Sequence, residues 1–334
     1  MDNPLNMKEV NQVVAAVVES VSEDEARQPK RYCATVFPGP QTEIDRTFAE
    51  SVLQLESLLG MSLWLIVQNG SGSYKNIDDA LADAVYQQRT ELFSEKPVGL
   101  LIHSWGGVAH SAYRIGRIFQ RRCKNLTAVI PNVAKSAATL LSLSASSIVF
   151  GPDAEVGPLD VQMWESDREE WSSALNAVQA LERMNAFSTS AIEQLVPLLK
   201  RRTEKKLDTL LPLVLDYVTN FVSPLLAKID TVEYTKKSRE LKVAEEYAIR
   251  LMMPNYPLEE AERIARALVE NYPAHEFVID RNEAITVKTI KAGKVFGLGL
   301  KSTQVSPEAG KALDLLGASV PKANIIGRVV EMKG

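Results

Sequence analysis

Short apolar runs alternate with amphipathic stretches between residues 41 and 150 of this 334-residue chain. Four apolar runs bounded by polar, Gly or Pro residues predict buried strands: Ser62–Gln68, Pro97–His103, Leu126–Pro131 and Ser147–Phe150. Apolar positions at helical spacing predict the helices around and between them: 41–60, Asn76–Phe93, Val108–Gln120 and Ala134–Leu143. Strands that alternate with helices favour right-handed crossovers, so the fold class is α/β with a mostly parallel sheet.

The regions that flank this core have a different pattern. Before it, positions near Met7–Val21 predict a short helix, and Phe37-Pro38-Gly39-Pro40 marks a boundary. After it, helical periodicity runs from Glu165 to Asn271 with almost no strand signal. The predicted helices of this block are Trp171–Arg183, Ala191–Thr203, Leu207–Ile229, Glu233–Met253 and Leu258–Glu270, and a further helix is expected to start over Asp280–Ala284.

These patterns divide the chain into four parts. We expect an N-terminal helix and linker (1–40), an α/β catalytic core (41–164), a helical block with a return segment that completes the core (165–301), and a C-terminal tail, partly disordered (302–334).

Composition and charge narrow the class of protein. The formal net charge is −4, which argues against a broad nucleic-acid surface. Cys33 and Cys123 imply neither a disulfide framework nor a metal site, and the three histidines (His103, His110 and His275) form no metal-binding pattern. The N-terminus lacks a signal-peptide pattern, and no stretch approaches 18 uncharged apolar residues. We therefore expect a cytoplasmic protein with no membrane span and no metal.

Two features lie where the predicted strands end, which is where ligands bind in open α/β sheets. Gly106 and Gly107 follow the second strand, and glycines at a helix start can expose N–H groups to a developing oxyanion. Ser136 begins a helix of small residues, where the helix dipole and the N–H of Ala137 would assist a nucleophile. A ligand-free tight turn and an ordinary serine N-cap are the simpler interpretations of these two features.

The order of these motifs resembles the Clp protease/crotonase superfold. Within it the chain is most similar to the serine dehydrogenase proteinase family, which is related to signal peptide peptidase A. The motifs that carry the resemblance are Leu100–Gly107, Ala134–Leu140, Ile148–Pro152, Val156–Gln162 and Ala274–Ile279. The chain departs from the family pattern at Trp105, Ala138 and Val161, and Trp105 is expected to fill part of the substrate groove.

The resemblance implies a serine peptidase or related acyl hydrolase that needs no cofactor. Ser136 would be its nucleophile, the amides of Gly107 and Ala137 its oxyanion hole, and a polypeptide its substrate. Members of this superfold commonly assemble, so a homo-oligomer is expected.

The general base is open at this stage. Our hypothesis is a triad of Ser136, His275 and Asp160, in which Asp160 orients the imidazole. The competing base is a lysine: Lys135, which is expected to face solvent, or one of Lys200, Lys205, Lys206 and Lys242. His103 is expected to be structural, and Ser104 is a weaker rival nucleophile.

Two further functions remain as alternatives to hydrolysis. One is a non-catalytic member of the superfold that binds a peptide or acts as a scaffold. The other is a crotonase-like acyl-CoA enzyme, for which Glu155 and Asp160 could serve as acids, although the sequence contains no evident nucleotide site.

Overall fold

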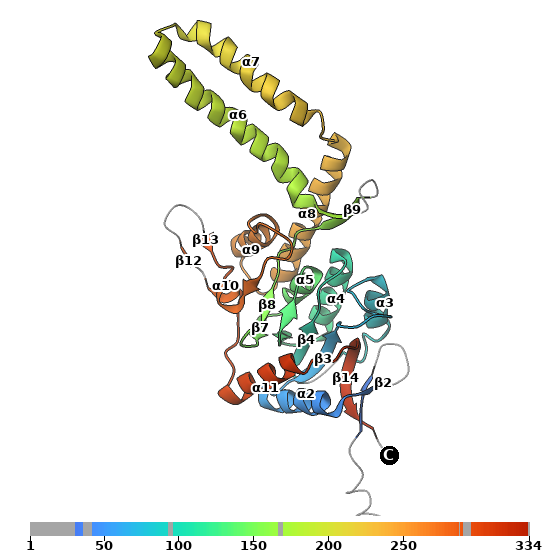
Figure 1. The fold of residues 1–334 in the computed structure, drawn as a ribbon. Helices are drawn as coiled ribbons and strands as arrows, with labels where there is room; N and C mark the ends of the chain where they lie inside the picture. The colour runs from blue at the N-terminus through green and yellow to red at the C-terminus, as the bar shows by residue number, and fades with distance from the viewer. Residues whose placement is uncertain are drawn as a thin grey trace, which may run out of the picture.

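The computed structural model describes residues 31–35, 42–92, 96–165, 170–286, 288–289 and 295–332, and its main sheet lies between two layers of helices (Figure 1). The sheet has seven strands in the order β2-β1-β14-β3-β4-β5-β7. Its parallel part consists of β3 (Ser62–Val67), β4 (Val98–His103), β5 (Thr127–Ile130) and β7 (Ser147–Phe150). The predicted α/β class and its four strands are confirmed.

The apolar strands are buried on both faces because a helical layer covers each one. Leu63 and Leu65 of β3 pack with α2 (Arg46–Leu59) and α11 (Pro307–Ala318), whereas Trp64 and Ile66 belong to the core on the opposite face. That second core is covered by α3 (Asp79–Gln87), α4 (Ala109–Arg122), α5 (Ala137–Ser142) and α9 (Leu258–Glu270). Continuous apolar runs are typical of strands covered on both sides.

The two ends of the chain meet in the same sheet, which the sequence patterns did not show. β14 (Ile325–Glu331) lies between β3 and β1 (Tyr32–Thr35), and β2 (Thr42–Ile44) forms the sheet edge. The interpretation of the segment after residue 302 as a tail is therefore wrong. Ile325 and Ile326 are buried against β3 through an antiparallel pairing across more than 250 residues, and local periodicity carries no signal for such a contact. The predicted helix near Met7–Val21 lies outside the described residues.

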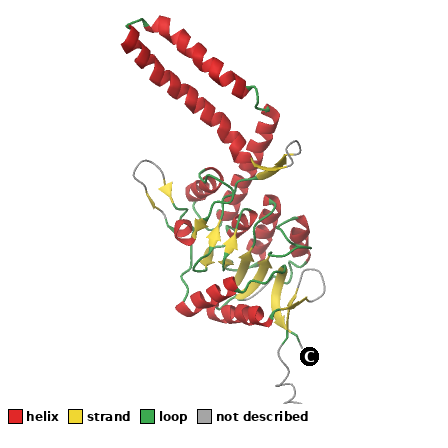
Figure 2. Cartoon of the chain, in the orientation of Figure 1, coloured by secondary structure: helices red, strands yellow, loops and turns green. Residues whose placement is uncertain are grey.

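The helical block forms a long hairpin that projects from the α/β body (Figure 2). Its arms are α6 (Ala174–Thr203) and α7 (Leu207–Leu226), and α8 (Thr231–Met252) leads back to the body. α6 replaces two predicted helices, because no helix breaker separates them. The predicted helix start at Trp171 is wrong: β9 (Gln162–Glu165) and β10 (Glu170–Ser173) form an antiparallel hairpin there.

One helix departs from the expectation that nothing could cross a membrane. α7 has the length and the mean hydropathy, 1.4, of a membrane-crossing helix, and only 22% of its apolar window is buried. Apolar helices of soluble proteins meet the same criteria. In this structure α7 packs on α6 through Val214, Val218 and Val222.

A second, smaller sheet lies beside the main one and determines the position of the site. It contains three strands in the order β11-β8-β6. They are β6 (Val133–Ala134), β8 (Glu155–Val156) and β11 (Ile279–Asp280). The return segment continues with the expected helix α10 (Arg281–Ile285), capped by Asp280, and with β12 (Lys288–Thr289) and β13 (Val295–Phe296).

Candidate active site

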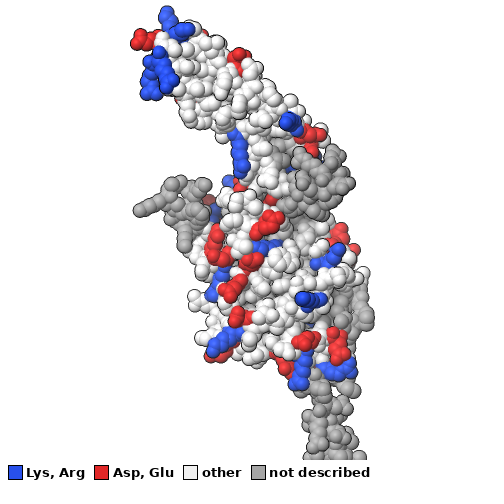
Figure 3. Space-filling view, in the orientation of Figure 1, with Lys and Arg blue, Asp and Glu red and all other residues white. Residues whose placement is uncertain are grey.

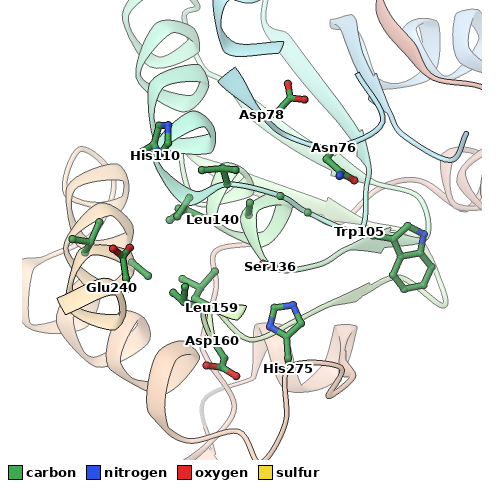
Figure 4. A pocket seen from close by; sticks show the side chains of 18 of the residues that line it. Asn76, Asp78, Trp105, His110, Ser136, Leu140, Leu159, Asp160, Glu240 and His275 are labelled. Carbon is green, nitrogen blue, oxygen red and sulfur yellow. The ribbon is translucent and has the colours of Figure 1, made fainter. Parts of the chain in front are cut away.

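The small sheet brings together three sequence-predicted residues that are far apart in the chain. Ser136 follows β6, Asp160 follows β8, and His275 precedes β11. Because β8 pairs with both β6 and β11, the connections that carry these residues lie at neighbouring positions. All three residues line one pocket of about 670 Å³ beside the end of β4 (Figure 4).

Ser136 occupies a strained turn between β6 and α5. Its backbone has φ 51° and ψ −119°, a conformation that costs a non-glycine residue about 1–3 kcal/mol. It stands at the N-cap position of α5, but its side chain makes no capping hydrogen bond. The simple N-cap interpretation is therefore wrong, and the half-buried hydroxyl faces the pocket instead. A sharp strand-to-helix turn that exposes a serine is the geometry of a nucleophile elbow.

The double-glycine turn lies directly against Ser136. A Cβ atom on Gly106, where φ is +111°, would stand 2.8 Å from Cβ of Ser136 and 3.2 Å from the amide nitrogen of Ala137. Only glycine permits this approach together with the left-handed φ. The predicted proximity of the double-glycine turn and Ser136 is thus present in the structure.

The amides of Gly107 and Ala137 are the predicted donors of the oxyanion hole. Ile77 accepts from the amide of Val108 and donates to the carbonyl of Gly106, so the intervening amide of Gly107 is directed away from Ile77. Ala137 is the first residue of α5, and the first amides of a helix have no acceptor within the helix. The amide of Ala137 belongs to the residue that follows Ser136, and Gly107 follows the glycine that packs against Ser136.

A buried polar pair supports the double-glycine turn. The hydroxyl of Ser104 donates to Oε1 of Gln68 at 2.6 Å and accepts from the amide of Gly106 at 3.0 Å. Gln68 in turn donates to the carbonyl of Tyr74. Ser104 is fully engaged and buried, so it is a supporting residue and not a rival nucleophile.

The pocket is lined by both apolar and polar side chains. The apolar ones include Leu140, Leu159, Val161, Val243 and Ala244, and the polar ones include Asn76, Asp78 and His110. Trp105 lines the pocket at its edge (Figure 4) and is 61% exposed. That Trp105 fills part of the substrate groove stays a prediction.

His275 lies between Ser136 and the chain around Asp160 in the close view (Figure 4). Its Nδ1 is buried and has no hydrogen-bond partner within the described part of the chain. Asp160 lies in the connection between β8 and β9 and is buried. Its carboxyl group accepts a hydrogen bond from the amide of Leu175, in the first turn of α6. Burial raises the pKa of Asp160, while hydrogen bonds from Ser173 and Leu175 and the charge of the nearby His275 act in the opposite direction.

The lysine candidates lie elsewhere or are engaged. Lys135 is only 5% exposed, so the expectation that it faces solvent is wrong; its ammonium group bonds to Glu155 at 3.1 Å. Lys242 pairs with Glu245. Lys200, Lys205 and Lys206 lie in or next to the turn that joins α6 and α7. Figure 3 shows basic side chains gathered at that end of the hairpin. None of the described residues that line the pocket is a lysine.

Neither of the other two histidines nor either cysteine is a candidate catalytic residue. Burial lowers the pKa of His103 to about 4, which agrees with a structural role at the end of β4. Nε2 of His110 lies 2.8 Å from the Asp79 carboxylate. Cys33 and Cys123 are free and buried. Within the ranges given above, no group of three His, Cys, Asp or Glu residues could hold a metal ion.

Residues 70–210 match the family model of the ClpP-like SDH-type serine proteinase. This part of the chain is therefore similar to that family. The matched segment includes the double-glycine turn, Ser136 and Asp160 and ends before His275.

Two curated relatives give a more limited comparison. They are the uncharacterized proteins MJ0137 and MJ1495 of Methanocaldococcus jannaschii, each 32% identical over 69 residues. That alignment covers 21% of this chain and 24% of each relative, so the chain spans about a quarter of the length of these relatives.

Several contributors to the site were missed in the sequence. Gln68 supports the double-glycine turn, and α8 supplies Glu240, Val243 and Ala244 to the pocket. Lys135 was a candidate base, but its bonds across the small sheet were not foreseen. The two-residue strands β6, β8 and β11 are too short to produce a period-two pattern. The amphipathic pattern of α8 predicted that one face of the helix is buried. It did not predict that this helix lies beside the pocket.

Proposed function

We propose that this protein is a serine peptidase, or a related acyl hydrolase, with Ser136 as its nucleophile. Ser136 Oγ attacks the substrate carbonyl carbon while His275 accepts its proton. The amides of Gly107 and Ala137 stabilise the oxyanion, and the protonated His275 then donates to the leaving amine or alcohol as the acyl bond breaks. Water hydrolyses the acyl-enzyme by the same steps. Asp160 is proposed to orient His275, and the site requires no cofactor.

The single observation that carries this proposal is the contact between the strained Ser136 turn and the double-glycine turn. It brings Gly106 against Ser136, whose side chain makes no capping hydrogen bond and lines the pocket. The match of residues 70–210 to the model of a serine proteinase family supports the same reaction. The strain at Ser136 is also what a preorganised nucleophile requires.

Reaction with a fluorophosphonate probe tests the proposal. In that reaction Ser136 Oγ bonds to phosphorus and fluoride leaves, and mass spectrometry of the digested protein should locate the adduct on the peptide that contains residue 136. Ser136→Ala should abolish labelling and peptide hydrolysis. Ser223→Ala, an exposed serine on α7, is the matched control and should label like the wild type. Undiminished labelling of Ser136→Ala would remove this serine from the mechanism.

A non-catalytic peptide-binding or scaffolding role is the second candidate. It is favoured by the buried Nδ1 of His275, which has no hydrogen-bond partner among the described residues, and by the engagement of Asp160 with the start of α6. A wild-type protein that binds peptides without reacting with the probe would support this second role.

We propose further that the protein acts on polypeptides in the cytoplasm as a homo-oligomer. The hairpin supports assembly, since large apolar side chains on α7 are exposed along one edge, among them Leu213, Tyr217 and Phe221. Exposed apolar surface of this kind is typical of protein contacts.

A further inference from the structure

Lys135 makes hydrogen bonds to several segments that surround the proposed active site. Its amide donates to the carbonyl of Ser104, next to the double-glycine turn, and its carbonyl accepts from Ala138 in the first turn of α5. Its side chain then crosses the small sheet. Nζ lies 3.1 Å from Glu155 Oε1, 3.3 Å from the carbonyl of Val156 and 3.3 Å from the carbonyl of Phe277.

These three acceptors account for the whole ammonium group. A lysine side chain carries three N–H donors and no acceptor, and here each donor has one partner. A charged donor that is satisfied in this way is a fixed bridge, whereas a general base would have to be neutral and directed at the Ser136 hydroxyl. The geometry therefore distinguishes Lys135 from the base of a Ser–Lys dyad.

The carbonyl of Phe277, which accepts from Lys135 Nζ, connects Lys135 to the segment that carries His275. Phe277 stands two residues after His275, in the segment between α9 and β11. Its carbonyl ties that segment to the residue that immediately precedes Ser136. Gly157 makes room for the bridge, because a Cβ atom there would stand 2.7 Å from Cδ of Lys135.

We propose that Lys135 is a positioning residue that sets the placement of His275 relative to Ser136. This inference rests on the proposed function, since it assigns Lys135 a role in the reaction of Ser136. The pairing of the following strand β11 with β8 spans two residues, so the bridge adds a further tie between the His275 segment and the small sheet. A displacement of a reacting group by about 1 Å can lower a rate about a hundredfold.

The test uses Lys135→Met, which keeps most of the stem and removes all three donors. We expect the maximal rate of fluorophosphonate labelling to fall about tenfold to a hundredfold, with the half-saturating probe concentration within about twofold of wild type. The midpoint of the acidic limb of the pH–rate profile should not move, because the base is still His275. Lys135→Arg should restore part of the rate. Lys237→Met, which removes a comparably buried, ion-paired lysine from α8, is the matched control.

A structural measurement separates failure of this inference from failure of the proposed function. Hydrogen exchange of the amides from His275 to Asp280 should be faster in Lys135→Met and in the charge-balanced double variant Lys135→Met/Glu155→Gln, while α2 and α11 exchange as in wild type. Wild-type labelling or unchanged exchange in a folded Lys135→Met would overturn the bridge. A shifted or lost acidic limb would instead make Lys135 the base. If the wild type does not label at all, the proposed function fails and the exchange result alone decides the structural role of Lys135.

Discussion

The turn around Ser136 and the α6–α7 hairpin differ in how many other segments of the protein contact them. At Ser136 the chain is held in a strained conformation by neighbours on several sides: the double-glycine turn, β8 and the start of the return segment. In the hairpin, two long helices have mainly each other as partners, with a narrow core of Val214, Val218 and Val222. A strained backbone conformation persists only where several surrounding contacts each hold the chain in it.

Because of this difference, we expect the hairpin to tolerate substitutions better than the turn around Ser136 does. A change in the packed turn must be felt at the pocket, because every atom there has close neighbours. A change on the hairpin can relax into solvent or alter an intermolecular contact, and it leaves the pocket intact. The following predictions test the contrast, from the largest expected effect to the smallest.

The largest effect is expected from Gly106→Ala. The new methyl group would meet Ser136 and the carbonyl of Lys135 at 2.8 Å, at a φ of +111° that alanine rarely adopts. Labelling of Ser136 should fall by about a hundredfold or more, as when an oxyanion donor is lost. Gly72→Ala is the matched control, since its φ is +92° but nothing lies within 4 Å. A similar loss in both variants would show that backbone strain alone, and not contact with Ser136, causes the effect.

Paired core truncations should differ in how far their effects spread. Leu101→Ala removes a fully buried side chain from β4 and should lower the free energy of unfolding of the body by about 2–5 kcal/mol. Val218→Ala removes less volume from the hairpin core, and faster hydrogen exchange should be confined to α6 and α7. Chemical denaturation and exchange measured on both variants check this. Equal loss of protection throughout the chain would contradict the independence of the hairpin.

Acidification should destabilise the body through His103. Burial lowers its pKa from 6.5 to about 4, so the unfolded chain takes up a proton as the pH falls through 6.5, whereas the folded chain does not until about pH 4. Stability is therefore lost as the pH falls between these two values, by on the order of 3 kcal/mol. Urea unfolding at several pH values should show a shallower loss in His103→Gln than in wild type. Parallel curves for the two proteins would count against this assignment.

The smallest effect on the site is expected from the exposed edge of the hairpin. Leu213→Ser combined with Phe221→Ser replaces two exposed apolar side chains and touches nothing in the pocket. The labelling rate per protomer should stay within about twofold, while light scattering should report a smaller particle if this edge forms the proposed oligomer contact. An unchanged mass would place that contact elsewhere.

Much of the α/β core could be predicted from local pattern. Leu63–Val67 and Leu100–Ile102 are apolar without interruption, which favours strands covered on both faces. The helix α2 ends at Gly60 as expected, and Gly60 has a left-handed φ. The motifs around Gly106, Gly107 and Ser136 were sufficient to indicate the family, which the match over residues 70–210 confirms.

Other features depended on contacts between distant segments. β14 has an apolar start, but only its pairing with β3 makes it part of the main sheet rather than a tail. Lys135 was expected in solvent because neighbouring side chains at a helix start diverge; it is buried because Glu155, Val156 and Phe277 surround its ammonium group. The roles of His275 and Asp160 remain predictions.

The sequence by itself determined the period of each element, the glycines at the strand ends and the serine between a strand and a helix, since these depend on neighbouring residues alone. The tertiary structure decided which turns meet. Pairings of two residues, between β6 and β8 and between β8 and β11, put Ser136, Asp160 and His275 around one pocket. Such pairings are stabilised by the packing around them, and no local pattern of residues encodes that packing.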